Sequence, residues 1–284
     1  ANNTGGNGVG VHVKNADVEM VNSIIASQAT GIHNDSSNVT VDGVLWYDNN
    51  AIASGGSISI QNEDTGDPAF VDPVNGDYHI GQTSAAIDNI EAIDTAVELD
   101  FDGDLRDAWP DLGADEYRTC RVQLNGVPYQ TVQDAVNAST DINDVVKIAG
   151  TCTGVQTQGE LEQTVYLSKT LTLRGGYSRG DWTTSDPEAY PTTLDAGGMG
   201  RVLVITGTIT PAIEGLLITG GNADTLGGGR SGEDAGGGIY VINATLTMRD
   251  NVVFNNRSPG PQADGGGIYI RQGSGILTGN RVIS

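Results

Sequence analysis

The stretch GGGIYVINATLTMRDNVVFNN, residues 236–256, decides the fold class. Apolar and polar side chains alternate in it, and alternation with a period of two is typical of β-strands that have one buried face. The inward face would consist of Ile239, Val241, Ala244, Leu246 and Met248. Glycines precede the first run and asparagines follow the last one. The stretch therefore predicts short strands joined by tight turns, without helices between them.

The same arrangement recurs on both sides of the quoted stretch. It begins again at residues 265–284 (GGGIYIRQGSGILTGNRVIS), 8–30 and 31–57. The period is roughly 23–29 residues, which signals stacked repeats. The repeats predict an all-β fold, a right-handed parallel β-helix whose coils stack at about 4.8 Å. Leucine-rich repeats would show a Leu-x-x-Leu-x-Leu spacing, which is missing, and an antiparallel sandwich would show hairpin turns without a period.

The composition limits the classes of function. The 284 residues carry 36 acidic and 14 basic side chains, a formal charge of −22. A polyanion of this size does not bind nucleic acid through phosphate contacts. No apolar run of about 18 residues appears, so the sequence predicts no membrane span. We expect a protein whose copies repel one another unless cations screen them.

Cys120 and Cys152 are the only cysteines. Two cysteines with none left over predict one disulfide, and with it an oxidising compartment. The alternative is two unrelated buried thiols. A disulfide would place the chain outside the cell or at the cell surface.

The segment YQTVQDAVNASTDINDVVKIAG, residues 129–150, resembles the opening of pectin-lyase-like right-handed β-helix proteins. The resemblance implies a short helix near 130–138 that Thr131 caps and that covers the open end of the first coil. Three apolar residues would lie on one face of that helix: Val132, Ala135 and Val136. The segments that follow resemble coils of bacterial surface β-helix proteins, and the GGGIY and FNN segments resemble repeats of polymorphic outer-membrane proteins.

Residues 67–117 are similar to the choice-of-anchor segment that ends many secreted bacterial β-helix proteins. The expected order is then final coils of one β-helix over 1–62, a terminal or capping segment with an acidic loop over 63–118, and the cap and first coils of the next β-helix over 119–284. This order suggests one period of a tandem array, with Ser284 adjoining Ala1 of the next unit. The alternative is a chain with two partial β-helices.

The acidic loop DFDGDLRD is the best candidate for a metal site. Asp100, Asp102 and Asp104, with Gly103 allowing a sharp turn, place three carboxylates in one loop, a spacing that favours calcium. The alternative is a charged turn in which Arg106 pairs with an aspartate. No other cofactor is expected.

The sequence predicts no catalytic site. Pectin-active β-helix proteins use basic residues beside calcium-binding acids, or paired acids with Gly-His-Gly and Arg-x-Lys stretches, and neither pattern appears. The histidines lie in separate segments at His12, His33 and His79. Because His12 and His33 each follow a glycine start, we expect them to stack on successive coils.

These observations favour a structural subunit of an extracellular filament or surface fibre, whose partners are copies of itself placed end to end. The alternative is a cell-surface adhesin or carbohydrate-binding stalk, and less favoured is a polysaccharide lyase or hydrolase. Trp46, Trp109 and Trp182 fall in different kinds of segment, so they form no aromatic ladder for sugars. Surface glycans would have to lie on outward turns. Candidate sequons include those that begin at Asn2, Asn38, Asn137, Asn243 and Asn256.

Overall fold

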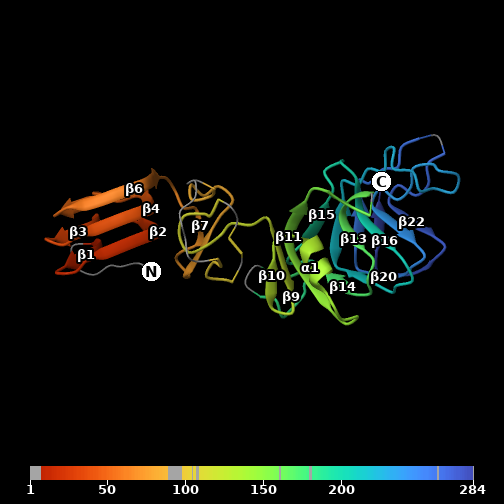
Figure 1. Ribbon diagram of the computed structural model, residues 1–284, viewed down its shortest axis with the longest axis horizontal. Coiled ribbons are helices and arrows are strands. Elements are labelled where there is room, and N and C mark those ends of the chain that lie inside the picture. The colour runs from red at the N-terminus through yellow and green to blue at the C-terminus, as the bar shows by residue number, and fades with distance from the viewer. Residues whose placement is uncertain are drawn as a thin grey trace. The chain divides into compact units, whose positions relative to one another are not determined.

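A computed structural model describes residues 8–88, 98–103, 105–106, 109–159, 161–178, 181–260 and 262–283. The chain divides into two compact units, residues 1–118 and 119–284. Among the described residues the regular elements are one helix and 24 strands, most of which pair in parallel (Figure 1). The prediction of an all-β fold is therefore confirmed. No helix in the described part of the chain is long and apolar enough to cross a membrane.

The second unit winds through three parallel sheets. Its elements are β9 (Cys120–Leu124), β10 (Val127–Tyr129), α1 (Val132–Ala138), β11 (Val145–Thr153), β12 (Gln156–Gln158), β13 (Leu161–Leu167), β14 (Thr172–Arg174), β15 (Thr192–Asp195), β16 (Arg201–Thr206), β17 (Ala212–Glu214), β18 (Leu216–Thr219), β19 (Ile239–Ile242), β20 (Thr245–Arg249), β21 (Val252–Phe254), β22 (Ile268–Arg271), β23 (Ser274–Thr278) and β24 (Arg281–Ile283).

The chain visits the three sheets in a fixed order. The first sheet holds β11, β14, β17, β20 and β23, and the second holds the end of β11 with β15, β18, β21 and β24. The third sheet holds β13, β16, β19 and β22. Each strand pairs in parallel with the strand that occupies its place one repeat later. The stretch over residues 236–256 supplies one strand to each sheet, β19, β20 and β21.

Alternation along these strands builds the core of the second unit. In β20, Leu246 and Met248 are fully buried, whereas Thr245 and Arg249 are exposed. The five residues expected on the inward face of the 236–256 stretch all belong to this core. Burying an aliphatic side chain of this size contributes about 1.5–3 kcal/mol. The predicted inward face is therefore confirmed.

Helix α1 is the helix expected near residues 130–138. The side chain of Thr131 accepts from the backbone N–H of Asp134, and the Asp134 side chain accepts from the N–H of Thr131, a reciprocal capping box. Val132, Ala135 and Val136 are buried in the core of the second unit. The helix contacts β9, β10, β11 and β13, so it lies over the start of the strand stack (Figure 1).

The two cysteines form a disulfide next to this helix. Cys120 opens β9 and Cys152 lies near the end of β11. β9 pairs antiparallel with β11, with Cys120 opposite Gly150. The bond therefore ties the β9–β10 hairpin, which leads into α1, to the first long strand of the stack.

The first unit is built from a smaller stack and an irregular segment. Its strands are β1 (Val9–Lys14), β2 (Val18–Ala26), β3 (Thr30–Asp35), β4 (Val39–Tyr47), β5 (Ala53–Gly55), β6 (Ile58–Thr65), β7 (Phe70–Asp72) and β8 (Asp77–Ile80). The chain alternates between two parallel sheets, β1-β3-β5 and β2-β4-β6 (Figure 1). Val44 and Trp46 of β4 point into the core between these sheets.

The segment after β6 packs against the outward face of this stack. Leu45 points away from Val44 and Trp46 because side chains alternate along a strand. It joins Ile80 and Leu112 in a separate buried cluster, against which Ile24 of β2 packs. The Asn22 side chain also accepts a hydrogen bond of 2.8 Å from the N–H of Gly113. The segment therefore covers the side of the stack.

Both units bend at residues with positive φ, the left-handed region that asparagine, aspartate and glycine tolerate best. In the second unit these corners are Asn243, Asp250 and Asn255. In the first unit they are Asn15, Asn22 and Ser27, and then Ser36, Gly43 and Asp48. In all three sets the corners are seven and five residues apart. The two units therefore use the same spacing of bends.

Candidate functional site

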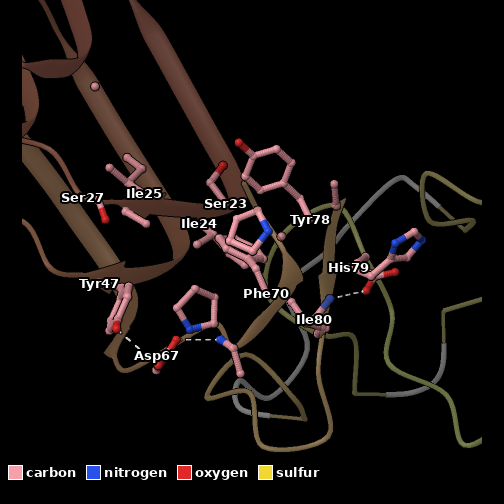
Figure 2. A pocket seen from close by; sticks show the side chains of 18 of the residues that line it. Ser23, Ile24, Ile25, Ser27, Tyr47, Asp67, Phe70, Tyr78, His79 and Ile80 are labelled. Atoms are coloured by element: carbon pink, nitrogen blue, oxygen red, sulfur yellow. Dashed lines mark hydrogen bonds between the residues drawn. The ribbon is translucent and has the colours of Figure 1, made fainter. Parts of the chain in front are cut away.

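The site begins with the β7–β8 hairpin in the first unit. Side chains alternate along β8, so Tyr78 and Ile80 lie on one face and Asp77 and His79 on the other. Figure 2 shows Tyr78 on the side of Ser23 and Ile24, whereas His79 points away from them. Ile80 is buried in the cluster behind the hairpin. Packing of Ile80 thus fixes the direction in which His79 points.

The His79 ring lies between two carboxylates. Its Nδ1 is 2.5 Å from Oδ1 of Asp77, and its Nε2 is 2.6 Å from Oδ2 of Asp102. Ionised carboxylates only accept hydrogen bonds, so two such contacts favour the imidazolium form, in which both ring nitrogens donate. Burial lowers the pKa of His79, whereas the hydrogen bonds to Asp77 and Asp102 raise it. The hydrogen bonds outweigh burial, so the pKa lies above the usual histidine value.

Asp115 completes the group, which we call the His79 cluster: Asp77, His79, Asp102 and Asp115. One ligand atom each of His79, Asp102 and Asp115 lies within 4.8 Å of the other two. Asp115 is 5% exposed and accepts a 2.7 Å hydrogen bond from the N–H of Ile80. Burial raises the pKa of Asp115, and the charges of Asp100 and Asp102 add to the rise.

The cluster borders an open cleft of about 1290 Å³ within the first unit. Asp77, His79 and Asp115 line it together with residues of β2 and with Tyr47 and Asp67 of the neighbouring turn. The Tyr47 hydroxyl donates to Oδ2 of Asp67 at 3.2 Å (Figure 2). The cleft gives solvent and small ions access to the His79 cluster.

The acidic loop predicted to bind calcium is only partly described. Gly103 adopts a φ of 83°, which confirms the sharp turn. Oδ1 of Asp100 accepts from the N–H of Asp102 at 2.9 Å, and its Oδ2 accepts from the N–H of Glu116 at 3.2 Å. Asp102 faces His79 instead, and Asp104 lies outside the described residues. The calcium site stays a prediction, and the structure separates the roles of Asp100 and Asp102.

A buried ion pair joins the end of the same loop to the segment that follows it. Nη1 of Arg106 lies 3.3 Å from Oε2 of Glu116, and the Arg106 guanidinium also donates to the carbonyls of Asp111 and Gly113. The sequence suggests an aspartate as the partner, and the ion pair described here is with a glutamate. Burial raises the pKa of Asp111 to about 7, although its carboxylate accepts from the N–H groups of Asp88 and Tyr117.

A second histidine group lies on the outer face of β1 and β3. His12 and His33 are direct partners in the parallel register, with ring centroids 5.0 Å apart. Both donate to Asp35, at 3.2 and 3.0 Å. The expected placement of these histidines beside each other on successive strands is confirmed, and their rings meet edge to face. Hydrogen bonds, first from His12, hold the pKa of Asp35 below its usual value.

Of the other predicted site residues, two are described by the structure and two are not. Cys120 and Cys152 are bonded, as described above. Ala1 and Ser284, the predicted junction, lie outside the described residues. Sequence reasoning missed Asp77, Asp115 and the role of His79. The alternation in Asp77-Tyr78-His79 could have placed two of them on one face, but no local pattern links them to Asp115.

No protein-family model, no curated protein and no solved structure matches this chain.

Proposed function

We propose that the chain is a module of an extracellular filament or surface fibre, in which right-handed parallel β-helices follow one another end to end. The proposal includes the kinship with secreted pectin-lyase-like proteins and their choice-of-anchor segments that the sequence suggests. The observation that carries it is the common coil plan of the two units. A common plan is what two parts of one repeated β-helix would need.

The plan extends from the corners to individual side chains. Asn256 follows the corner at Asn255 in the second unit; its side chain accepts from the N–H of Gly221 and donates to the carbonyl of Ile218. Asn49 follows the corner at Asp48 in the first unit, and it accepts from the N–H of Gln28 and donates to the carbonyl of Ile25. In each unit an asparagine thus joins one coil to the coil before it.

The third sheet of the second unit and β1-β3-β5 share another position. Tyr240 and Tyr269 are register partners in β19 and β22, with stacked rings 5.9 Å apart. His12 and His33 occupy the same place after the glycine start. A row of outward rings therefore characterises this sheet in both units. Tyr240 itself lies under the Gly228 carbonyl and beside Arg201, so it offers no exposed platform for a sugar.

The contact between modules would use apolar side chains of the last strands, which occupy core positions of the repeat but are exposed. Leu277 of β23 pairs with the buried Met248, and Val282 of β24 pairs with the buried Val253, yet they are 45% and 55% exposed. Strand edges with unpaired N–H and C=O groups recruit further strands. A coil of another copy, stacked on β22, β23 and β24, would bury both side chains and pair the edge. Repeating this contact produces a filament, because a heterologous interface that does not close continues indefinitely.

Charge and chemistry are consistent with this role. The disulfide fits an oxidising environment outside the cell. The charge of −22 on each chain would keep filaments apart laterally while stacked coils hold modules lengthwise. Glycans at outward corners would be compatible with stacking at Asn243, which is exposed, and less so at Asn256, whose side-chain amide is used within the coil.

Electron microscopy and sedimentation of the purified chain test the proposal. We expect thin filaments at physiological salt, and fewer of them at low salt, where repulsion is unscreened. Leu277→Asp should abolish them, because it places a charge in the buried contact. Thr278→Asp adds the same charge at an outward position of the same strand and should leave them intact. Isolated particles at every salt and protein concentration, or equal effects of the two variants, would contradict the proposal.

A further inference from the structure

We propose that the His79 cluster binds a divalent transition-metal ion, with zinc as the probe, through Nε2 of His79 and one carboxylate oxygen each from Asp102 and Asp115. The inference is independent of the proposed fibre. It concerns a different ligand set from the three loop aspartates considered for calcium, because only Asp102 is common to both.

The ligand atoms of the His79 cluster have the kind and the spacing that a metal ion needs. The three candidate atoms lie within 4.8 Å of one another. A tetrahedral ion at about 2.0 Å from each would hold them about 3.3 Å apart. The Nε2 to Oδ2 distance between His79 and Asp102 is 2.6 Å, so it would lengthen by about 0.7 Å as the ion replaces the proton between them. Water entering from the cleft would complete the coordination.

The His79 ring is also oriented for metal binding. Nδ1 of His79 donates to Asp77, which leaves Nε2, the nitrogen that faces Asp102, to bind an ion. Metal-binding histidines almost always donate their other ring N–H to a carboxylate or carbonyl, which fixes the tautomer and raises the basicity of the ligating nitrogen. Asp77 is placed for that supporting role.

Negative charge at the site also favours a cation. The carboxylates of Asp77 and Asp102 contact the two ring nitrogens of His79, and Asp100 contributes a further negative charge to the field at Asp115. Asp115 is almost completely buried, and a buried carboxylate requires a compensating charge. A divalent ion supplies one more positive charge than the proton it displaces from His79.

The imidazole ligand decides the class of ion. Calcium and magnesium take oxygen ligands, whereas imidazole suits zinc, copper, nickel and iron. A metal ion binds the unprotonated nitrogen, so it competes with a proton for Nε2 of His79.

The test uses the full chain after treatment with a chelator. Zinc titration with a competing chromophoric chelator should show one tight site per chain, and the melting temperature of the first unit should rise with zinc and not with millimolar calcium. Cobalt bound to the unmutated chain should give the visible absorption of a tetrahedral site with nitrogen and oxygen ligands. This readout does not depend on any variant folding.

Matched variants locate the site. His79→Gln and Asp115→Asn should each abolish zinc binding, and the amide introduced by Asp115→Asn would still offer a carbonyl oxygen to the N–H of Ile80. Asp77→Asn should weaken zinc binding about 10–100-fold without abolishing it. His33→Gln, in the other histidine group of the same unit, should have no effect. The proposal fails if calcium binds and zinc does not, if neither ion binds, or if His33→Gln removes the zinc while His79→Gln does not.

Discussion

The disulfide between Cys120 and Cys152 crosslinks the first strands of the second unit. The two cysteines join the hairpin before α1 to β11, and their separation in sequence is 32 residues. In the chain-entropy model a crosslink of this loop length stabilises the folded state by about 3–4 kcal/mol. We expect the double variant Cys120→Ser, Cys152→Ser to lower the denaturation midpoint of the second unit by a corresponding amount. A reductant should lower the midpoint of the unmodified protein equally and leave the variant unchanged, and equal midpoints for variant and unmodified protein would contradict this role.

Asp111 should make the stability of the first unit depend on pH. Its pKa in the folded state is raised to about 7, so the folded state holds a proton that the unfolded chain releases near pH 4. The contribution is therefore present below pH 4 and is lost as the pH rises from about 4 to 7, with a slope of up to about 1.4 kcal/mol per pH unit. Chemical denaturation across this range should show a steeper slope in the unmodified chain than in Asp111→Asn, which keeps the contribution of other groups with a raised pKa, such as Asp115. An unchanged slope in the variant would assign it to other groups.

Asp144 in the second unit provides the control of opposite sign. Hydrogen bonds, first from the Asn125 side chain and then from backbone N–H groups, lower its pKa to about 2. Its contribution is present above pH 4 and is lost as the pH falls from about 4 to 2. Asp144→Asn should therefore flatten the acid side of the stability profile of the second unit and leave the range between pH 4 and 7 unaffected.

At the scale of elements, the corners decide how strands follow one another. Asn243 has a φ of 59° and an exposed side chain, so its substitution acts mainly on the backbone. Asn243→Val should cost about 1–2 kcal/mol, because a β-branched residue is strained in this region. Asn243→Gly should be close to neutral, and Thr245→Val, in the adjacent strand, should not destabilise. Denaturant unfolding of the second unit distinguishes these outcomes, and equal stabilities of the Asn243→Val and Asn243→Gly proteins would show that the corner is not constrained.

The strands and the helix could be predicted from the sequence, because alternation and a capping residue are local signals. Leu246 and Met248 alternate with polar neighbours, and Thr131 precedes the apolar face of α1. The corners were harder to predict, because Asn15 or Ser36 resembles any polar turn residue until its φ is known. The His79 cluster could not be predicted, since Asp102 and Asp115 lie 23 and 36 residues from His79 and no period connects them. The sequence singles out Asp100 and Asp102 as ligands, yet backbone amides occupy the Asp100 carboxylate.

At the scale of the whole molecule, the account depends on whether the two units are parts of one kind of β-helix. Each unit has its own core and its own parallel sheets. In the first unit, β4 is buried while Val18 and Met20 of β2 are only half-buried beside it. In the second, Leu277 and Val282 are exposed beside buried partners. Stacking the first unit of one module on the second unit of another would bury both sets.

Hydrogen exchange in a circular permutant tests most directly whether the two units stack on each other. The permutant contains residues 119–284 followed by residues 1–118, so its composition is that of the unmodified chain and only the order of the units differs. We compare hydrogen exchange in β22–β24 and β1–β2 in both proteins, at a concentration at which the unmodified chain is monomeric. The account predicts that exchange in these strands is at least about tenfold slower in the permutant, because β24 and β2 become neighbours in one continuous stack. Equal exchange rates in the two proteins, with both units folded, would contradict it.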